Sequence, residues 1–234
     1  SVRMKTLSAA LVLLSLISVG QPASLACEKL LKPVDQRPDL PGRWYFIAVS
    51  TEFCLTSTLV RALFSPSAAV DVIAKGTPNL YGDTTYLKAN GVCINGTTTF
   101  IYANSSIFEV DSENADATAD KPDVLLQTGC PDCLVTKEDK SHLLLFSRRT
   151  AVSAAELTEF ETQAECLGWS KPQLFNTDHD YEKCAQFDED MDEEKFSQVL
   201  QSFFQKTLER MKTTYHLLTK CMAEGLISYL PSLI

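Results

Sequence analysis

The chain has 234 residues, and its 21 basic and 30 acidic side chains give a formal net charge of −9 at pH 7. An acidic chain of this kind is a poor candidate for binding nucleic acid or an anionic membrane surface, because both repel negative charge. Beyond the N-terminus, no stretch is long and apolar enough to span a bilayer. The length therefore indicates one all-β domain with additional tail sequence.

The N-terminus has the features of a secretory signal. Lys5 precedes an apolar run over 11–19, and small residues at 23–26 are typical of a cleavage site. We expect residues 1–26 to be a signal peptide that is removed before Cys27; a lipid-modified cysteine there is the weaker alternative. The mature chain would carry 19 basic and 30 acidic residues, a net charge of −11. We expect it to be secreted, into plasma or another body fluid.

The middle of the chain has the pattern of short strands separated by turns. Short apolar and β-branched runs alternate with clusters of Gly, Asn, Asp, Ser and Pro. The predicted strands cover 43–50, 58–64, 68–75, 79–88, 92–102, 106–111, 123–128, 133–138 and 142–149. The acidic stretch at 111–120 is expected to be a long exposed hairpin turn. About eight antiparallel strands in succession indicate an up-and-down barrel or a sandwich.

The pattern then becomes helical. Ser153 and Glu156 have the spacing of a capping box, in which each side chain satisfies a free backbone N–H of the other residue. Apolar residues follow at helical spacing until Gly168, so we expect a helix of about four turns packed against the barrel. A short strand is predicted at 173–176.

The last segment, 187–234, differs from the rest of the chain. An acidic run at 188–194 leads into a stretch with apolar residues near helical spacing, which predicts a long amphipathic helix over 196–222. This helix would dock on the barrel, lie on a lipid particle or pair with a partner.

Three landmarks in order resemble the lipocalin family. Gly42-Arg43-Trp44 opens an aromatic strand, 143–148 ends a late strand with Arg148, and the capped helix follows directly. The resemblance implies an eight-stranded antiparallel up-and-down barrel with one helix outside, over residues 27–186. It also implies that Arg148 lies against Trp44 at the closed base of the barrel, where a cation–π contact contributes roughly 1–2 kcal/mol when desolvated.

Within lipocalins, the chain resembles the branch of α-1-acid glycoprotein (orosomucoid) and apolipoprotein M. The opening strand 44–48 and 129–131 resemble apolipoprotein M, while 165–167 and 183–184 resemble orosomucoid. Some relatives of this branch in fish sequester xenobiotics or toxins.

Eight cysteines in an exported chain indicate disulfides, but eight cysteines allow 105 pairings. The branch resemblance implies two of the pairs, Cys27–Cys166 and Cys93–Cys184. The remaining cysteines stay unassigned: Cys54, Cys130, Cys133 and Cys221. A pair between the two hairpin cysteines, or between one of them and the cysteine after the first strand, is open.

The sequons at Asn95 and Asn104 predict surface glycans. An outward Asn95 has consequences for its strand, because side chains alternate between the two faces of a sheet. If Asn95 points outward and Arg148 points inward, the alternation along their two strands predicts which side chains form the wall of a ligand cavity. Together with a tyrosine of the preceding strand, the predicted wall comprises Thr98, Phe100, Tyr102, Tyr86, Leu144 and Phe146. A solid core of the same residues is the alternative.

The leading hypothesis is a secreted carrier that binds a small hydrophobic or amphipathic molecule: a lipid, steroid, xenobiotic or toxin. A sphingosine-1-phosphate ligand is less favoured, because Gly96 and Thr98 stand where a phosphate head group would need basic or aromatic side chains. An isomerase that uses Cys54 in its cavity is one alternative. A protein that acts on a lipid particle, such as a lipoprotein, through its C-terminal helix is another.

We expect no enzyme activity, no cofactor and no metal. The Cys130–Cys133 spacing is also found in redox motifs, but here it lies between strands rather than at a helix start. The three histidines are scattered along the chain and do not suggest a zinc site. The sequence does not predict the oligomeric state.

Overall fold

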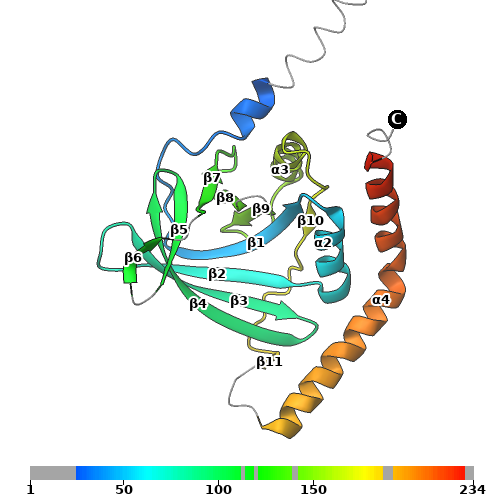
Figure 1. Cartoon of the computed structure of the whole chain (residues 1–234). Helices are drawn as coiled ribbons and strands as arrows, with labels where there is room; N and C mark the ends of the chain where they lie inside the picture. The colour runs from blue at the N-terminus through cyan, green and yellow to red at the C-terminus, as the bar shows by residue number, and fades with distance from the viewer. Residues whose placement is uncertain (1–24, 112–113, 119–120, 139–141, 187–191, 230–234) are drawn as a thin grey trace, which may run out of the picture.

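The structure is a computed structural model that describes residues 25–111, 114–118, 121–138, 142–186 and 192–229. Most of the predicted signal peptide lies outside these ranges. The described part consists of a β-barrel with one helix against its wall and a longer helix beyond one end (Figure 1). In this part of the chain, no helix combines the length and apolarity that crossing a membrane requires.

Eight antiparallel strands form the barrel, in the sheet order β4-β3-β2-β1-β9-β8-β7-β5. Their bounds are β1 (Gly42–Thr51), β2 (Ser67–Ala74), β3 (Leu80–Ala89), β4 (Val92–Ala103), β5 (Ser106–Asp111), β7 (Asp123–Leu126), β8 (Cys133–Glu138) and β9 (His142–Ser147). The sheet closes because β4 also pairs with β5, from Thr99 opposite Val110 to Ala103 opposite Ser106. The predicted fold class, a closed eight-stranded lipocalin-type barrel with a helix outside, is confirmed.

Three short strands extend the sheet. β6 (Asn114–Thr118) pairs with β5, β10 (Gln173–Leu174) pairs with β1, and β11 (Ala185–Gln186) runs parallel to β4. The expectation of a long hairpin turn over the whole of 111–120 is therefore wrong, since Asn114–Thr118 forms a strand that pairs with β5.

The prediction of a strand at 58–64 is also wrong. This segment is helical: α2 (Cys54–Leu59) continues into a wider turn, η1 (Val60–Phe64). Its β-branched residues favour a strand locally, but the segment packs against the C-terminal helix α4 (Glu193–Tyr229), with Phe64 stacked on Phe203 at 5.8 Å between ring centroids. Tertiary packing here overrides the strand propensity.

Helix α3 (Ala154–Cys166) begins and packs as predicted. The Ser153 side chain accepts from the Glu156 backbone N–H, and the Glu156 carboxylate accepts from the Ser153 backbone N–H. The helix buries Phe160 and Ala164 against the outer side of the sheet, together with Leu143 and Leu145 of β9. Because side chains alternate along β9, the residue that follows, Phe146, belongs to the cluster inside the barrel.

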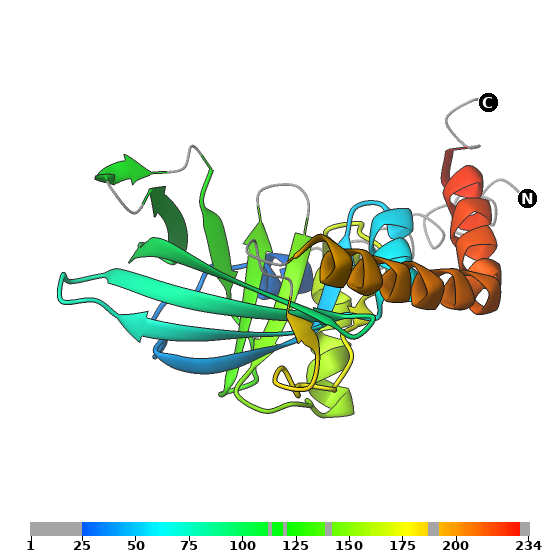
Figure 2. The same cartoon turned by 90° about the horizontal axis from the view of Figure 1, so that it is seen from below.

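Helix α4 lies beyond the end of the barrel in both views (Figures 1 and 2), and in Figure 1 α2 stands between them. Most of its contacts with the rest of the described chain are to α2 and η1, and Thr207 accepts a hydrogen bond from the Asn90 side chain at 2.8 Å. The opposite side of α4 is not covered by the described part of the chain, so large apolar residues there are exposed.

Candidate functional site

The base of the barrel is built around Trp44 and Arg148. The guanidinium carbon of Arg148 lies 3.7 Å from the centroid of the Trp44 ring, and the ring nitrogen donates to the carbonyl of Leu40 at 2.8 Å. Arg148 donates to three backbone carbonyls of the segment that crosses the base: Asp39, Pro41 and Arg43. Desolvation lowers the pKa of Arg148, but a guanidinium keeps its charge at any physiological pH.

Gly42 is needed at this base for two reasons. Its φ of +106° lies in a region that side-chain-bearing residues rarely adopt, and a Cβ atom would stand 2.6 Å from Nη1 of Arg148. The glycine therefore lets the strand approach the guanidinium closely. Gly42, Trp44 and Arg148, the three residues predicted for the barrel base, lie together at this closed end.

Above the base lies a cavity of about 300 Å³, which is here called the calyx. Its lower wall is apolar and comes from six strands. The apolar lining consists of Leu40, Trp44, Phe46, Val70, Val72, Phe100, Ile107, Leu134 and Phe146. A volume of this size lies at the lower end of the range for small-molecule sites.

A ring of polar side chains lies one layer above the apolar wall. Five strands each have an inward apolar residue near the base and a polar residue two positions farther from the base. Residues two positions apart on a strand share one face, so the polar residues also point inward. The ring consists of Asp83 on β3, Thr98 on β4, Glu109 on β5, Asp123 on β7 and Thr136 on β8. Thr85 and Lys121 complete the polar lining of the calyx.

The carboxylates of this ring influence one another. Burial, together with the negative charges of Glu138 and Glu109, raises the pKa of Asp123 to about 6. Burial also raises the pKa of Glu138, whose carboxylate lies 3.2 Å from Nδ1 of His142. Asp83 accepts hydrogen bonds from Thr98 and Thr85. The ring is therefore a region of concentrated negative charge over an apolar chamber.

The structure places the six predicted cavity residues in three environments. Thr98, Phe100 and Phe146 line the calyx. Tyr102 and Leu144 are buried but are not among the lining residues.

Tyr86 was expected in the cavity wall and is instead on the outer face of the barrel. Its strand register pairs it with Asn95, which faces outward, so both side chains point away from the calyx. Tyr86 stacks on Tyr181 at 5.7 Å between ring centroids, and the guanidinium of Arg43 lies over its ring.

Asp83, Glu109 and Asp123 were not among the predicted site residues. For Asp83, the alternation of side chains could have indicated this position. Asp83 and Thr85 lie two and four positions after Tyr81, which is buried inside the barrel, so all three point to the same face of the strand. Acidic residues in strands are usually assigned to the solvent face, and only the closed sheet shows that these three converge.

Three disulfides are described. Cys27 bonds to Cys166 and ties the N-terminal segment to α3, while Cys93 bonds to Cys184 beside β11. The third joins Cys130 and Cys133 across the turn between β7 and β8. Cys221 is also disulfide-bonded, and the described residues include no free cysteine. The side chain of Cys54, considered above for an isomerase, lies outside the described part.

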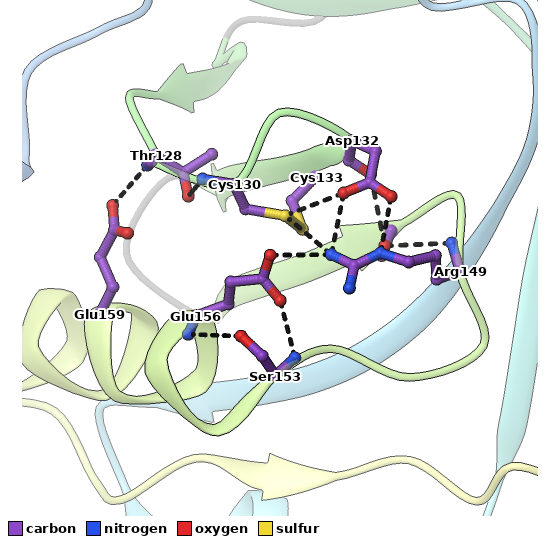
Figure 3. Close-up of a disulfide and its surroundings, with 10 residues drawn as sticks. Thr128, Cys130, Asp132, Cys133, Arg149, Ser153, Glu156 and Glu159 are labelled. Carbon is purple, nitrogen blue, oxygen red and sulfur yellow. Dashed lines mark hydrogen bonds and ion pairs between the residues drawn. A yellow bond between two sulfur atoms is a disulfide. The ribbon is translucent and has the colours of Figure 1, made fainter.

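The hairpin disulfide sits in a charged cluster that Figure 3 shows in detail. Arg149 donates to Asp132 at 2.6 Å and 2.9 Å and to Glu156 at 2.8 Å, and its Nη2 lies 3.3 Å from the Cys130 sulfur. The two sulfurs and the two carboxylates are close enough to hold a metal ion. The arrangement suits a guanidinium instead, because Arg149 already neutralises both carboxylates and the sulfurs are bonded to each other. The cluster joins the hairpin to the start of α3.

The two sequons are exposed, as glycosylation would require. The Asn95 side chain is exposed on the outer face of β4, and Asn104 is exposed in the turn between β4 and β5 with a φ of 50°. Glycans at these positions would point away from the calyx.

A closed antiparallel barrel with a tryptophan–arginine base, an internal cavity and an outer helix defines a lipocalin. The sequence profile of the ApoM domain matches residues 11–188, and the chain therefore belongs to the ApoM domain family. Helix α4 lies outside the matched range. The search of curated proteins gives no match.

Solved structures with a similar fold include two lipocalins. One, described as the siderocalin Ex-FABP with dual ligand specificities, has 15% identity and a TM-score of 0.47, over 63% of this chain and 98% of its own. The other, a lipocalin whose expression is activated by the myc oncogene, has 18% identity and a TM-score of 0.40, over 56% of this chain and 84% of its own.

Proposed function

We propose that this protein is a secreted carrier that binds one small hydrophobic or amphipathic molecule in the calyx, without catalysing a reaction. The observation that carries the proposal is the layered cavity: an apolar chamber above the sealed base, topped by a ring of polar groups. A ligand would gain roughly 25 cal/mol for each Å² of apolar surface that it buries, and the ring would fix its orientation.

The disulfides support the secreted location, because such bonds form and persist in oxidising compartments. Lipids, steroids, xenobiotics and toxins are the ligand classes to be considered. A phosphate head group is disfavoured, because three carboxylates face the space that it would occupy.

Ligand binding is expected to quench the fluorescence of Trp44, which lines the calyx. The Trp169→Phe variant leaves Trp44 as the single reporter, since the chain has two tryptophans. We expect the neutral dye N-phenylnaphthylamine to quench this signal in a saturable titration, because the bound dye lies within energy-transfer distance of the ring.

A matched pair of variants locates the binding site. Thr85→Phe puts a large side chain into the calyx and is expected to weaken dye binding about tenfold or more, whereas Thr84→Phe points outward on the same strand and should leave binding unchanged. No saturable quenching by any member of a broad apolar panel would contradict the carrier function.

A second candidate function, association with lipid particles, is favoured by the exposed face of α4. Four large side chains at intervals of four, three and four residues form one exposed stripe: Phe204, Leu208, Met211 and Tyr215. Residues 195–220 of this helix carry five basic side chains and one acidic one, although the whole chain is acidic. An amphipathic helix with this charge is suited to lie on a lipid surface.

Flotation with phosphatidylcholine vesicles, with and without phosphatidylserine, tests this association. We expect the protein to float with the vesicles and more so with the anionic lipid, and the Phe204→Ser, Leu208→Ser double variant to stay at the bottom of the gradient. The control Thr213→Ser changes a residue off the stripe and should float normally. Equal flotation of the double variant would exclude the stripe as the lipid contact.

A further inference from the structure

We propose that a pocket on the outer face of the barrel is the seat of an N-linked glycan, and that the first N-acetylglucosamine of a glycan on Asn95 packs into it. The pocket, here called the outer pocket, has a volume of about 390 Å³ and lies between β3, β4 and residues 179–186. Its lining shares no residue with that of the calyx. The inference depends on the proposed secreted location, because N-glycans are added in the secretory pathway, but not on any calyx ligand.

Asn95 forms part of the wall of the outer pocket, so a sugar on its side chain starts at the pocket itself. The residue directly opposite it on the neighbouring strand is Tyr86. Directly opposed residues of an antiparallel pair share one face, with Cβ atoms about 4.5–5.5 Å apart. The whole sequon 95–97 is exposed, as the attachment of a glycan requires. The first sugar therefore has an aromatic side chain beside its point of attachment.

Two tyrosines give the outer pocket a fixed aromatic wall. Tyr86 stacks on Tyr181 at 5.7 Å between ring centroids, and the Tyr181 hydroxyl lies 3.0 Å from Nδ1 of His179. The guanidinium carbon of Arg43 lies 5.3 Å from the centroid of the Tyr86 ring, while its Nε donates to Asp71 at 2.7 Å. Tyrosine offers an apolar surface to the C–H groups of a sugar ring. Because these side chains already hold one another, the sugar orders little on packing against them.

The polar groups of the outer pocket suit a neutral, hydroxylated ligand. Two charged residues of the lining already have partners, since Arg43 pairs with Asp71 and Asp180 pairs with a lysine outside the lining at 2.8 Å. Glu182 and Gln186 are exposed at the wall. A carboxylate accepts hydrogen bonds from hydroxyl and acetamido groups, and a side-chain amide both donates and accepts. N-acetylglucosamine offers these groups without a charge of its own.

The second sequon is an internal comparison. Asn104 lies in the turn between β4 and β5 and is not among the residues that line the outer pocket. A glycan there has no contact with the tyrosine wall. The two sites of one chain should therefore differ in how strongly their first sugar interacts with the protein.

The stability of the glycoprotein tests this difference. The full chain is secreted from cultured animal cells, and its glycans are trimmed enzymatically to one N-acetylglucosamine per site. Thr97→Ala and Ser106→Ala each remove one sequon while keeping its asparagine. We expect loss of the Asn95 sugar to lower Tm by about 2–4 °C and loss of the Asn104 sugar to lower it by less than about 1 °C. The same two substitutions in unglycosylated protein correct for the side-chain changes themselves.

NMR locates the sugar in the trimmed glycoprotein. The acetyl methyl signal of the Asn95 sugar should lie upfield of that of the Asn104 sugar, because it lies against aromatic rings. Tyr86→Leu should move the signal back towards the Asn104 value and abolish the stabilisation by the Asn95 sugar. Tyr215→Leu removes an exposed tyrosine on α4 and should change neither result.

The outcomes separate this inference from the secreted location on which it depends. Mass spectrometry that finds Asn95 empty and Asn104 occupied overturns the inference and leaves secretion standing. Equal methyl shifts at the two sites, or equal changes in Tm, also overturn it. If the chain stays inside the cells with both sites empty, the secreted location is wrong and the inference falls with it.

Discussion

Replacing Trp44 with alanine is expected to lower the free energy of unfolding by about 3–5 kcal/mol, the usual range for removing a buried tryptophan. The ring is 4% exposed, packs against the Arg148 guanidinium and donates to the Leu40 carbonyl. The substitution leaves a void at the base and an unpaired carbonyl. Urea titration followed by circular dichroism measures the change without depending on tryptophan fluorescence.

Trp169→Ala is the control for this prediction. Trp169 is only partly buried and packs against the outer cluster near α3, so its loss should cost clearly less than that of Trp44. A double-mutant cycle of Trp44→Phe with Arg148→Met then isolates the contact between ring and guanidinium. We expect a coupling energy of about 1–2 kcal/mol. A coupling near zero would show that the two side chains stabilise the base independently.

Removing the Cys27–Cys166 disulfide by a double serine substitution is expected to reduce stability by about 5 kcal/mol on the chain-entropy model. The bond joins residues 139 positions apart, so it strongly restricts the unfolded chain. It also connects the N-terminal segment, which reaches the barrel base, to α3 on the outer wall. Denaturant titration of the two proteins under non-reducing conditions gives the difference.

The hairpin disulfide provides the comparison. Cys130 and Cys133 are three positions apart, and the same relation assigns their bond only about 2 kcal/mol. The Cys130→Ser, Cys133→Ser variant should therefore keep a folded barrel, held at this turn by Arg149 with Asp132 and Glu156. If the short-loop variant were destabilised as much as the long-loop one, the loss would have to come from contacts in the native hairpin instead of from loop entropy.

Much of the barrel could be predicted because local patterns report local constraints. The capping box at Ser153 and Glu156 predicts where α3 begins, since capping involves only neighbouring backbone groups. The alternation in β4 and β9 assigns Phe100 and Phe146 to the inside. A strand has two faces, so one residue of known direction fixes the direction of all the others. The same reasoning, applied to β3 with the register in hand, would have placed Tyr86 outside.

By itself, the sequence determined an all-β domain, the helix that follows its last long strand and a long amphipathic helix at the C-terminus, while the resemblance to lipocalins implied the barrel and its tryptophan–arginine base. Only the tertiary structure decided that residues 54–64 form helical turns under α4 and that three acidic residues from β3, β5 and β7 converge above one apolar chamber. The reason is physical: caps and alternation act within a few residues, whereas the field in a cavity depends on which distant strands the closed sheet brings together.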